Sequence, residues 1–361
     1  MASTYERATF LLVTICCVQF LPGPAFAATR TYYIAADEVP WNYAPLGRDV
    51  VRGKPIDPPA SDRIGTTYRK ALYRQYTDGS FTTLKRRPSA EAYLGYLGPV
   101  IRAEVGDTIR VVFRNRGTHP YSMHPHGVFY TKANEGAPYN DGTTPVDRPG
   151  DSVAPGRTYV YTWLVPERAG PGPMDPNSIA WMYHSHVNEN RDVASGLTGP
   201  IIISRRGELR PNGLPRGVDH EVIASLDFND ENGSWFLDDN IQKYVKDPAK
   251  SKAEGPAFFA SNELASINGF IDANMPTIAL RRGERVRWYV LGGMGSDLDF
   301  HVLHWHGATA LVDGMRTDMV ELPTPGSMRV ADMVPDAVGL WLFHCHVPGH
   351  MAEMNGLFSV R

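Results

Sequence analysis

The sequence predicts an all-β protein with two domains of similar size. Its 361 residues include 34 glycines and 29 prolines without a collagen period, which is typical of a turn-rich β protein. Short runs of β-branched and aromatic residues alternate with clusters of Gly, Pro, Asp and Asn, as strands alternate with turns. With 42% hydrophobic residues, the chain can bury a sizeable core. Few helices are expected.

Six segments show the strand pattern, and turn residues bound each of them. They are residues 108–113, 158–164, 200–204, 220–226, 285–291 and 340–343. The polar, Pro- and Gly-rich residues 206–217 interrupt this succession. They are predicted to link a first domain, residues 28–205, to a second domain, residues 218–361.

Residues 1–27 have the form of a secretory signal peptide. Arg7 precedes an apolar run over residues 8–20, and Ala25-Phe26-Ala27 has the small-x-small form of a cleavage site. A single membrane anchor is the alternative, but the run is short for a span of about 20 residues. We therefore expect an exported protein, periplasmic or secreted, with no membrane contact after the signal is removed.

Removal of the signal would leave Cys345 as the only cysteine, because Cys16 and Cys17 lie within it. No intramolecular disulfide could then form, so an unpaired thiol in an exported protein calls for another role. The formal net charge is −3, with Lys and Arg scattered along the chain. This distribution argues against nucleic acid as a partner.

The two halves repeat one order of histidine motifs, as diverged copies of one unit would. In the first half, His-Pro-His-Gly at 124–127 is followed by His-Ser-His at 184–186. In the second half, His-Trp-His-Gly at 304–307 is followed by His-Cys-His at 344–346. These four His-x-His pairs hold eight of the twelve histidines.

The His-x-His spacing predicts metal sites. On a strand, residues i and i+2 face the same side, so each pair delivers two imidazoles into one space. Four such pairs at repeated positions are hard to explain as ordinary surface or core histidines. His119 and His220 neither belong to a His-x-His pair nor flank one, and they are interpreted as structural.

The segment from His344 to Met354 indicates a second kind of metal site. A cysteine thiolate, two imidazoles and a long axial thioether form the trigonal blue-copper site of electron-transfer proteins. Cys345, His350 and Met354 supply three of these groups, and His301 is the obvious fourth. Met351 is interpreted as packing.

These residues resemble the multicopper oxidases, and among them the ceruloplasmin-like branch. The resemblance implies two cupredoxin domains, each a Greek-key β-barrel, in an exported copper oxidase that reduces dioxygen to water. The motifs that carry it are YLGP at 96–99, AEVGDT at 103–108, YSMHPHGV at 121–128, VPER at 165–168, GLTGP at 196–200 and ING at 267–269.

Position by position, the resemblance implies four coppers per chain. Two histidines match the type 2 copper, His124 and His304. Six match the type 3 pair, namely His126, His184, His186, His306, His344 and His346. Four residues match the type 1 copper, namely His301, Cys345, His350 and Met354.

Two residues depart from the family pattern. Ser185 stands where a blue-copper domain would have cysteine, so the first half is expected to lack type 1 copper. Met354 follows His350 by four residues, a spacing that resembles azurin, whereas the multicopper oxidases usually place the axial residue five after that histidine.

Eight histidines match the type 2 and type 3 coppers, which together form one cluster of three coppers. Each half supplies four of these histidines, so two halves must face each other. The resemblance to two-domain laccases implies a homotrimer, with each cluster formed between the first half of one chain and the second half of the next. Closure within one chain is the open alternative.

The sequence indicates the reaction with dioxygen more clearly than it indicates the substrate that is oxidised. Where ceruloplasmin-like ferroxidases carry iron-binding side chains, the aligned positions here are Ala260, Ala265 and Gly349. The nearby acids Glu263, Asp297 and Asp299 are interpreted as solvated loop residues. We therefore favour a small phenol or aromatic amine that reaches the edge of His350 or His301, with a ferroxidase or other metal-ion oxidase as the alternative.

Two acids are candidate proton donors for dioxygen reduction, Asp141 and Asp192. For Asp141, an ordinary turn in Asn-Asp-Gly is the competing interpretation. Two other protein classes stay open, a copper nitrite reductase and a non-catalytic copper-binding protein. The first needs one catalytic copper rather than eight cluster histidines, and the second usually lacks some of those histidines.

Overall fold

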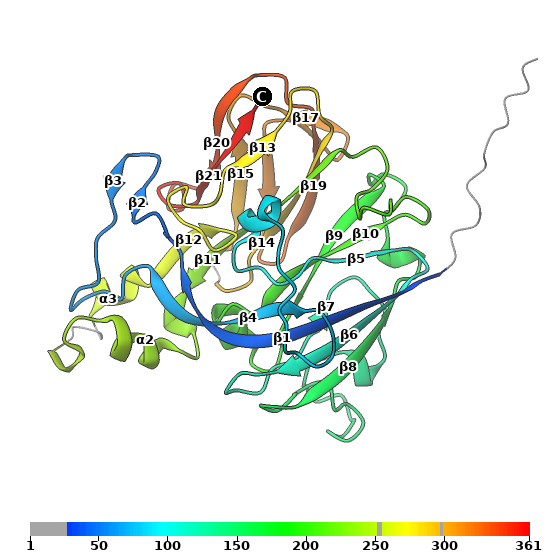
Figure 1. Cartoon of the computed structure of the whole chain (residues 1–361), viewed down its shortest axis with the longest axis horizontal. Helices are drawn as coiled ribbons and strands as arrows, with labels where there is room; N and C mark the ends of the chain where they lie inside the picture. Colours follow the sequence, from blue (N-terminus) through cyan, green and yellow to red (C-terminus); the bar gives the residue numbers. More distant parts are fainter. Residues whose placement is uncertain (1–26, 251–254, 297–298) are drawn as a thin grey trace, which may run out of the picture.

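The computed structural model describes residues 27–250, 255–296 and 299–361, which form two pairs of packed sheets (Figure 1). The predicted signal peptide, with Cys16 and Cys17, lies outside the described residues except for its last position. Strands dominate and helices are few and short, so the all-β prediction is confirmed. None of the helices in these ranges has the length and apolar character that a membrane crossing needs.

Two four-stranded sheets make up the first half of the chain. One has the order β4-β1-β6-β8, with bounds β1 Thr29–Asn42, β4 Thr67–Tyr76, β6 Thr108–Asn115 and β8 Thr158–Leu164. The other has the order β5-β10-β9-β7, with bounds β5 Ile101–Glu104, β7 His124–Pro125, β9 Ser178–His184 and β10 Thr198–Ser204.

The second half repeats this two-sheet arrangement. A six-stranded sheet has the order β12-β11-β14-β19-β16-β17, with bounds β11 His220–Asp230, β12 Glu263–Ile267, β14 Val286–Gly292, β16 Ala310–Val312, β17 Met315–Thr317 and β19 Met328–Met333. A five-stranded sheet has the order β13-β21-β20-β15-β18, with bounds β13 Ile278–Leu280, β15 His301–Trp305, β18 Met319–Leu322, β20 Gly339–Cys345 and β21 Asn355–Val360.

The remaining elements are short. The hairpin strands β2 Arg48–Asp49 and β3 Lys54–Pro55 project from the first half. Three α-helices are α1 Glu189–Ala194, α2 Leu237–Tyr244 and α3 Pro256–Ser261. Five 3-10 turns are η1 Ser89–Leu94, η2 Lys132–Asn134, η3 Glu167–Ala169, η4 Glu231–Gly233 and η5 Pro248–Lys250.

All six strands predicted from the sequence are present, as β6, β8, β10, β11, β14 and β20. The prediction missed the long strand β1 because its burial does not alternate. β1 lies between β4 and β6, and its residues 34–37 are buried in succession. A strand covered on both faces loses the period-2 pattern that reveals a half-buried strand.

One buried cluster spans both halves, because Tyr43, Tyr96 and Ile202 of the first half belong to it together with Val222 and Ile267 of the second. We propose the domain division at residues 206–217, since the first pair of sheets ends at β10 and the second begins at β11. This linking segment is anchored to the first half, because Glu104 accepts backbone N–H groups from Gly207 and Leu209 at 3.1 Å each.

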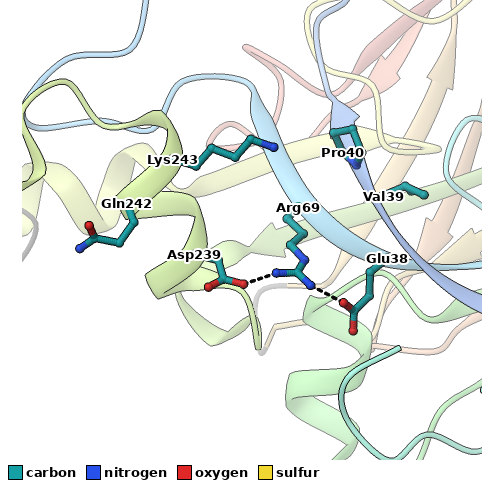
Figure 2. A pocket seen from close by; sticks show the side chains of 7 residues that line it. All are labelled: Glu38, Val39, Pro40, Arg69, Asp239, Gln242 and Lys243. Carbon is teal, nitrogen blue, oxygen red and sulfur yellow. Dashed lines mark hydrogen bonds and ion pairs between the residues drawn. The ribbon is translucent and has the colours of Figure 1, made fainter. Parts of the chain in front are cut away.

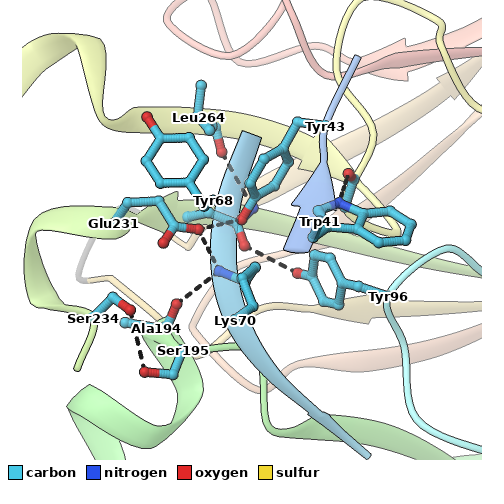
Figure 3. Close-up of polar contacts among 12 residues, drawn as sticks. Trp41, Tyr43, Tyr68, Lys70, Tyr96, Ala194, Ser195, Glu231, Ser234 and Leu264 are labelled. Carbon is cyan, nitrogen blue, oxygen red and sulfur yellow. Dashed lines mark hydrogen bonds and ion pairs between the residues drawn. The ribbon is translucent and has the colours of Figure 1, made fainter. Parts of the chain in front are cut away.

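A buried ion pair joins the halves. Figure 3 shows Lys70 of β4 against Glu231 of η4, both with fully buried side chains. The Tyr43 hydroxyl donates to Glu231 at 2.5 Å, and the Lys70 ammonium donates to the Ala194 carbonyl at 2.9 Å. These hydrogen bonds offset part of the cost of burying two charges, and the bond from Tyr43 to Glu231 connects the two halves.

A shallow pocket lies beside this junction, at the edge between β4 and α2 (Figure 2). Arg69, next to Lys70 on β4, bridges Glu38 of β1 and Asp239 of α2. These partly exposed ion pairs contribute little to stability individually. They do hold α2 of the second half against the first sheet.

Candidate metal centres

The two strands β15 and β20 bring His301 and Cys345 together. β15 runs antiparallel to β20 with Leu303 opposite Cys345, so His301 at the start of one strand lies near the end of the other. His301 Nδ1 is 3.8 Å from the Cys345 Sγ, and His350 Nδ1 is also 3.8 Å from it. All three side chains are buried, and their ligand atoms lie within 4.8 Å of one another.

A tight turn after β20 returns the chain to this site. The Met354 backbone N–H donates to the His350 carbonyl at 2.9 Å, and the Cys345 N–H donates to the Met354 carbonyl at 3.0 Å. Met354 is fully buried in the same cluster as Cys345. The shorter His350-to-Met354 spacing therefore still brings the methionine beside the cysteine.

Asp299 contacts the edge of the His301 ring that faces away from Cys345. Its carboxylate lies 3.1 Å from His301 Nε2 and accepts the Phe228 N–H at 2.6 Å. Burial lowers the pKa of His301, but the hydrogen bonds to Asp299 and Cys345 outweigh it and raise that pKa to about 9. Because Nε2 is bound to Asp299, Nδ1 faces the cysteine.

The expectation that Asp299 is a solvated loop acid is wrong. Asp299 is fully buried, because its carboxylate accepts backbone donors and caps His301. Glu263 is exposed, as expected. Asp297, the third acid of that group, lies outside the described residues.

Cys345 is held in a form that can bind a metal. Burial alone would raise the pKa of the Cys345 thiol. Hydrogen bonds from His301 and His350 together have the larger, opposite effect and lower this pKa to about 6. The thiolate is the metal-binding form of cysteine. A buried thiolate with two imidazoles and a methionine fits copper, whose blue sites use this donor set.

The other eight predicted ligands form two separate groups of four. The first-half quartet is His124 and His126 from β7 and the turn after it, with His184 and His186 from the end of β9. The second-half quartet is His304 and His306 from β15 and the turn after it, with His344 and His346 from β20 and the loop after it.

Within each quartet the imidazole nitrogens converge. His126 Nε2 lies 3.1 Å from His184 Nε2, and His306 Nε2 lies 3.2 Å from His344 Nε2. Burial and the neighbouring histidines lower the pKa of His126 to about 4. Neutral imidazoles are the ligand form of histidine, so the quartets also fit a metal.

Backbone carbonyls orient several of these rings. His124 Nδ1 donates to the Glu135 carbonyl at 2.8 Å, and His344 Nδ1 donates to the Cys345 carbonyl at 2.8 Å. Each such bond leaves Nε2 free to bind a metal.

A glycine follows the first His-x-His pair of each half for a steric reason. Gly127 and Gly307 have positive φ values of 75° and 64°. A Cβ atom would lie 2.2 Å from the Trp181 ring at Gly127 and 2.6 Å from the Trp341 ring at Gly307. Only glycine combines this backbone conformation with the close approach of tryptophan.

The two quartets do not meet within one chain. Among the described residues, ring contacts link histidines within each quartet, and none joins one quartet to the other. In the second-half quartet, His306 and His346 are exposed. The chain thus carries two separate histidine quartets, and two histidines of the second are open to solvent.

The two predicted acids lie in different surroundings. Asp141 forms a turn with Thr143 and an ion pair with Lys132 at 2.8 Å, and hydrogen bonding from Lys132 lowers its pKa. Asp141 held as an anion by Lys132 is well suited to fix the loop and poorly suited to donate a proton. Asp192 is fully buried and touches Ser185, between two quartet histidines.

The structure also places two other acids against the quartets. Glu189 lies 3.3 Å from His186 Nε2 and 3.8 Å from His184 Nε2. Asp318 lies 3.5 Å from His304 Nε2. Sequence reasoning missed both, although Glu189 follows His186 by only three residues. The two histidines outside the pattern lie elsewhere, His119 stacked on Trp235 at 4.3 Å and His220 beside Glu284 at 3.6 Å.

Comparisons of sequence point to one family. Two multicopper oxidase family models match residues 76–208 and 244–360. The chain is 41% identical over 346 residues to hephaestin of Homo sapiens, 40% over 356 residues to a ferroxidase of Mus musculus, and 38% over 346 residues to ceruloplasmin of Rattus norvegicus. These alignments cover 92%, 95% and 93% of this chain but only 29%, 30% and 32% of the relatives.

Comparisons of structure agree on the fold. The blue copper oxidase of Nitrosomonas europaea matches with a TM-score of 0.58 at 18% identity, covering 92% of this chain and 86% of that one. The copper nitrite reductase of the same organism matches with a TM-score of 0.58 at 17% identity, covering 92% and 94%. The predicted architecture of two cupredoxin domains is confirmed.

Proposed function

The chain belongs to the multicopper oxidase family, and we propose that it couples one-electron oxidation of a small phenol or aromatic amine to the reduction of dioxygen to water. The observation that carries this proposal is the presence, in one chain, of a buried Cys345–His301–His350 group and two histidine quartets. We propose export to the periplasm or the exterior from the composition of residues 1–27.

We propose four coppers per chain in the assembled protein. His301, Cys345, His350 and Met354 would hold type 1 copper, His124 and His304 type 2 copper, and the other six quartet histidines the type 3 pair. When bound, these coppers would supply one-electron acceptors that together deliver four electrons to dioxygen.

Cys345 connects the two kinds of site. It lies between His344 and His346 in the chain, so its backbone links the thiolate covalently to two quartet histidines. The His344 Nδ1–H bond to the Cys345 carbonyl shortens this link to a few bonds. Both routes are rigid, because β20 pairs with β15 and β21 on its two sides.

His350 is the better point of contact with a reducing substrate. His301 Nε2 is occupied by Asp299, and both groups are buried. His350 is buried as well, but it lies beside the rings of Phe228 and Phe300, at 5.2 and 5.8 Å between centroids. Phe300 is 43% exposed, so an aromatic substrate can reach the histidine along an apolar side chain.

The positions aligned with an iron site support the same substrate class. Ala260 is exposed on α3, Ala265 is buried in β12, and Gly349 has open space where a Cβ would lie. None of these side chains can bind a cation. A phenol needs no such ligand, because it transfers its electron through contact with the imidazole edge.

Oxidation of Fe(II) is the second candidate function. It is favoured by the 40% identity to a protein named as a ferroxidase, which exceeds what a shared fold alone requires. Fe(II) would be the substrate in that case, and a carboxylate outside the aligned positions would have to receive it.

We predict that kcat/KM for an electron-rich phenol exceeds that for Fe(II). Replacing Phe300 by alanine should raise KM for the phenol by roughly 2- to 10-fold, because an aromatic pair contributes about 0.5–1.5 kcal/mol. KM for Fe(II) should stay unchanged. Steady-state oxygen uptake with each substrate measures both values.

The paired variant Ala260→Glu with Gly349→Asp is the matched gain-of-function control. Both positions have room for the new side chain, so a rise in Fe(II) turnover is expected without loss of phenol turnover. Fe(II) turnover that already exceeds phenol turnover, and does not respond to this variant, would reject the phenol proposal in favour of a ferroxidase.

We further propose that the active species is a homotrimer. The separation of the quartets within one chain and the exposure of His306 and His346 support a cluster that forms between chains. A head-to-tail contact of a first half with a second half closes into a ring.

A further inference from the structure

The first half contains a buried counterpart of the second half's Cys345 site. Counted from the repeated His-x-His motifs, Tyr121 corresponds to His301, Ser185 to Cys345 and Ala194 to Met354. Tyr121 and Ser185 are fully buried. This donor set lacks thiolate, imidazole and thioether, so it does not fit copper.

A carboxylate contacts the serine that stands in place of the cysteine. Asp192 of α1 is fully buried, and four hydrogen bonds from protein donors satisfy it. The donors are Ser185 Oγ at 2.6 Å, Val187 N at 3.1 Å, Asn188 N at 3.1 Å and Trp235 Nε1 at 2.9 Å. A buried carboxylate with this many directed donors has one preferred position, which it imposes on its partners.

The hydrogen bonds continue to the histidines of the first-half quartet. Ser185 Oγ accepts the Ser122 N–H at 3.0 Å, and Ser122 Oγ accepts the His186 N–H at 3.0 Å. Ser122 lies two residues before His124. Asp192, Ser185 and Ser122 thus tie the 184–186 segment to the segment that carries His124.

The second half of the same chain takes part through Trp235. Its indole N–H holds Asp192, and its ring stacks on His119 at 4.3 Å and lies under the Arg191 guanidinium at 4.7 Å. The Trp235 N–H also donates to Ser195 Oγ at 3.0 Å. The position of the first-half quartet is therefore coupled to the loop after η4.

We propose that Asp192 is a positioning residue, which takes the place of a type 1 copper in the first half. It fixes the geometry of His184 and His186 and, through Ser185 and Ser122, that of the type 2 ligand His124. This role differs from proton donation, the role expected of Asp192 from the sequence. It rests on the proposed copper cluster. The partners of a metal-binding histidine commonly contribute 10- to 100-fold in metal affinity.

The test is titration of the copper-free full-length protein with copper, for the native chain and for Asp192→Asn, Ser185→Ala and Trp235→Phe. The type 2 electron paramagnetic resonance signal reports the cluster, and the blue absorption reports the Cys345 site. We expect cluster affinity to fall about 10- to 100-fold in Asp192→Asn, with altered type 2 hyperfine splitting and unchanged blue absorption. The other two variants should show the same change to a smaller degree, and they keep the test decisive if Asp192→Asn does not fold.

Asp230→Asn is the matched control, since Asp230 caps η4 near Trp235 and asparagine caps a helix equally well. It should leave the titration unchanged. Native cluster affinity and type 2 signal in Asp192→Asn, combined with lost turnover and a shifted pH profile, would overturn the proposal and assign proton delivery to Asp192. A native protein that binds no cluster copper would instead reject the proposed function on which the proposal rests.

Discussion

Cys345→Ser is expected to remove the blue colour and to lower oxidase turnover more than about 100-fold, beyond the cost of losing a hydrogen-bond partner of a metal ligand. A serine hydroxyl is a poor ligand for a soft metal, and it cannot replace the thiolate that His301 and His350 face at 3.8 Å. Copper should fall by one per chain while the type 2 signal persists, because His344 and His346 remain in place. Copper analysis and absorption spectra of the same sample measure both effects.

The matched control for this variant is Met351→Leu, which changes an exposed side chain next to His350. Its absorption spectrum should match that of the native protein. Persistence of the blue colour in Cys345→Ser would place the type 1 site elsewhere. Loss of all copper would mean that Cys345 is needed for the fold.

Mixing two inactive variants is expected to restore oxidase activity. One chain carries His124→Ala and His126→Ala, and the other carries His304→Ala and His306→Ala, so each alone lacks two of the eight histidines of every cluster. If clusters form between chains, random assembly pairs an intact first half with an intact second half at about one quarter of the interfaces. Activity of about one quarter of the native value should then appear on co-refolding or co-expression.

Two variants damaged in the same half provide the control. A chain with His124→Ala and His126→Ala, mixed with a chain carrying His184→Ala, has no intact first half and should stay inactive. If the complementary pair also stays inactive while light scattering shows mixed oligomers, the cluster closes within one chain. A fully active monomer would lead to the same conclusion.

The sequence predicted which histidines come together with one another and with Cys345 better than it predicted the residues around them. The His-x-His spacing needs only the local geometry of a strand, so the predicted groups converge in the structure without further information. The Cys345 site required in addition that β15 and β20 be neighbours, which the internal repeat supplied. The burial and the partners of the acids depend on tertiary contacts, which no local sequence pattern predicts.

Asp299 and Asp192 illustrate this limit. Both occur in polar segments that suggest exposure, yet both are fully buried because backbone N–H groups from distant residues surround them. The strand β1 was missed for a related reason. Ile34 and Ala36 pack in one buried cluster and Ala35 in another, so both faces are covered and the alternation is lost. Phe228 and Phe300 gave no signal either, because their role depends on the position of His350.

Copper content measured together with the double-integrated electron paramagnetic resonance spectrum decides whether the histidine quartets form a copper cluster. We predict four coppers per chain in the assembled protein. Two of them should be visible by resonance, one with the narrow hyperfine splitting of type 1 and one with the wide splitting of type 2. One copper per chain, or the absence of a type 2 signal in fully loaded protein, would contradict the assignment of the histidine quartets to a copper cluster.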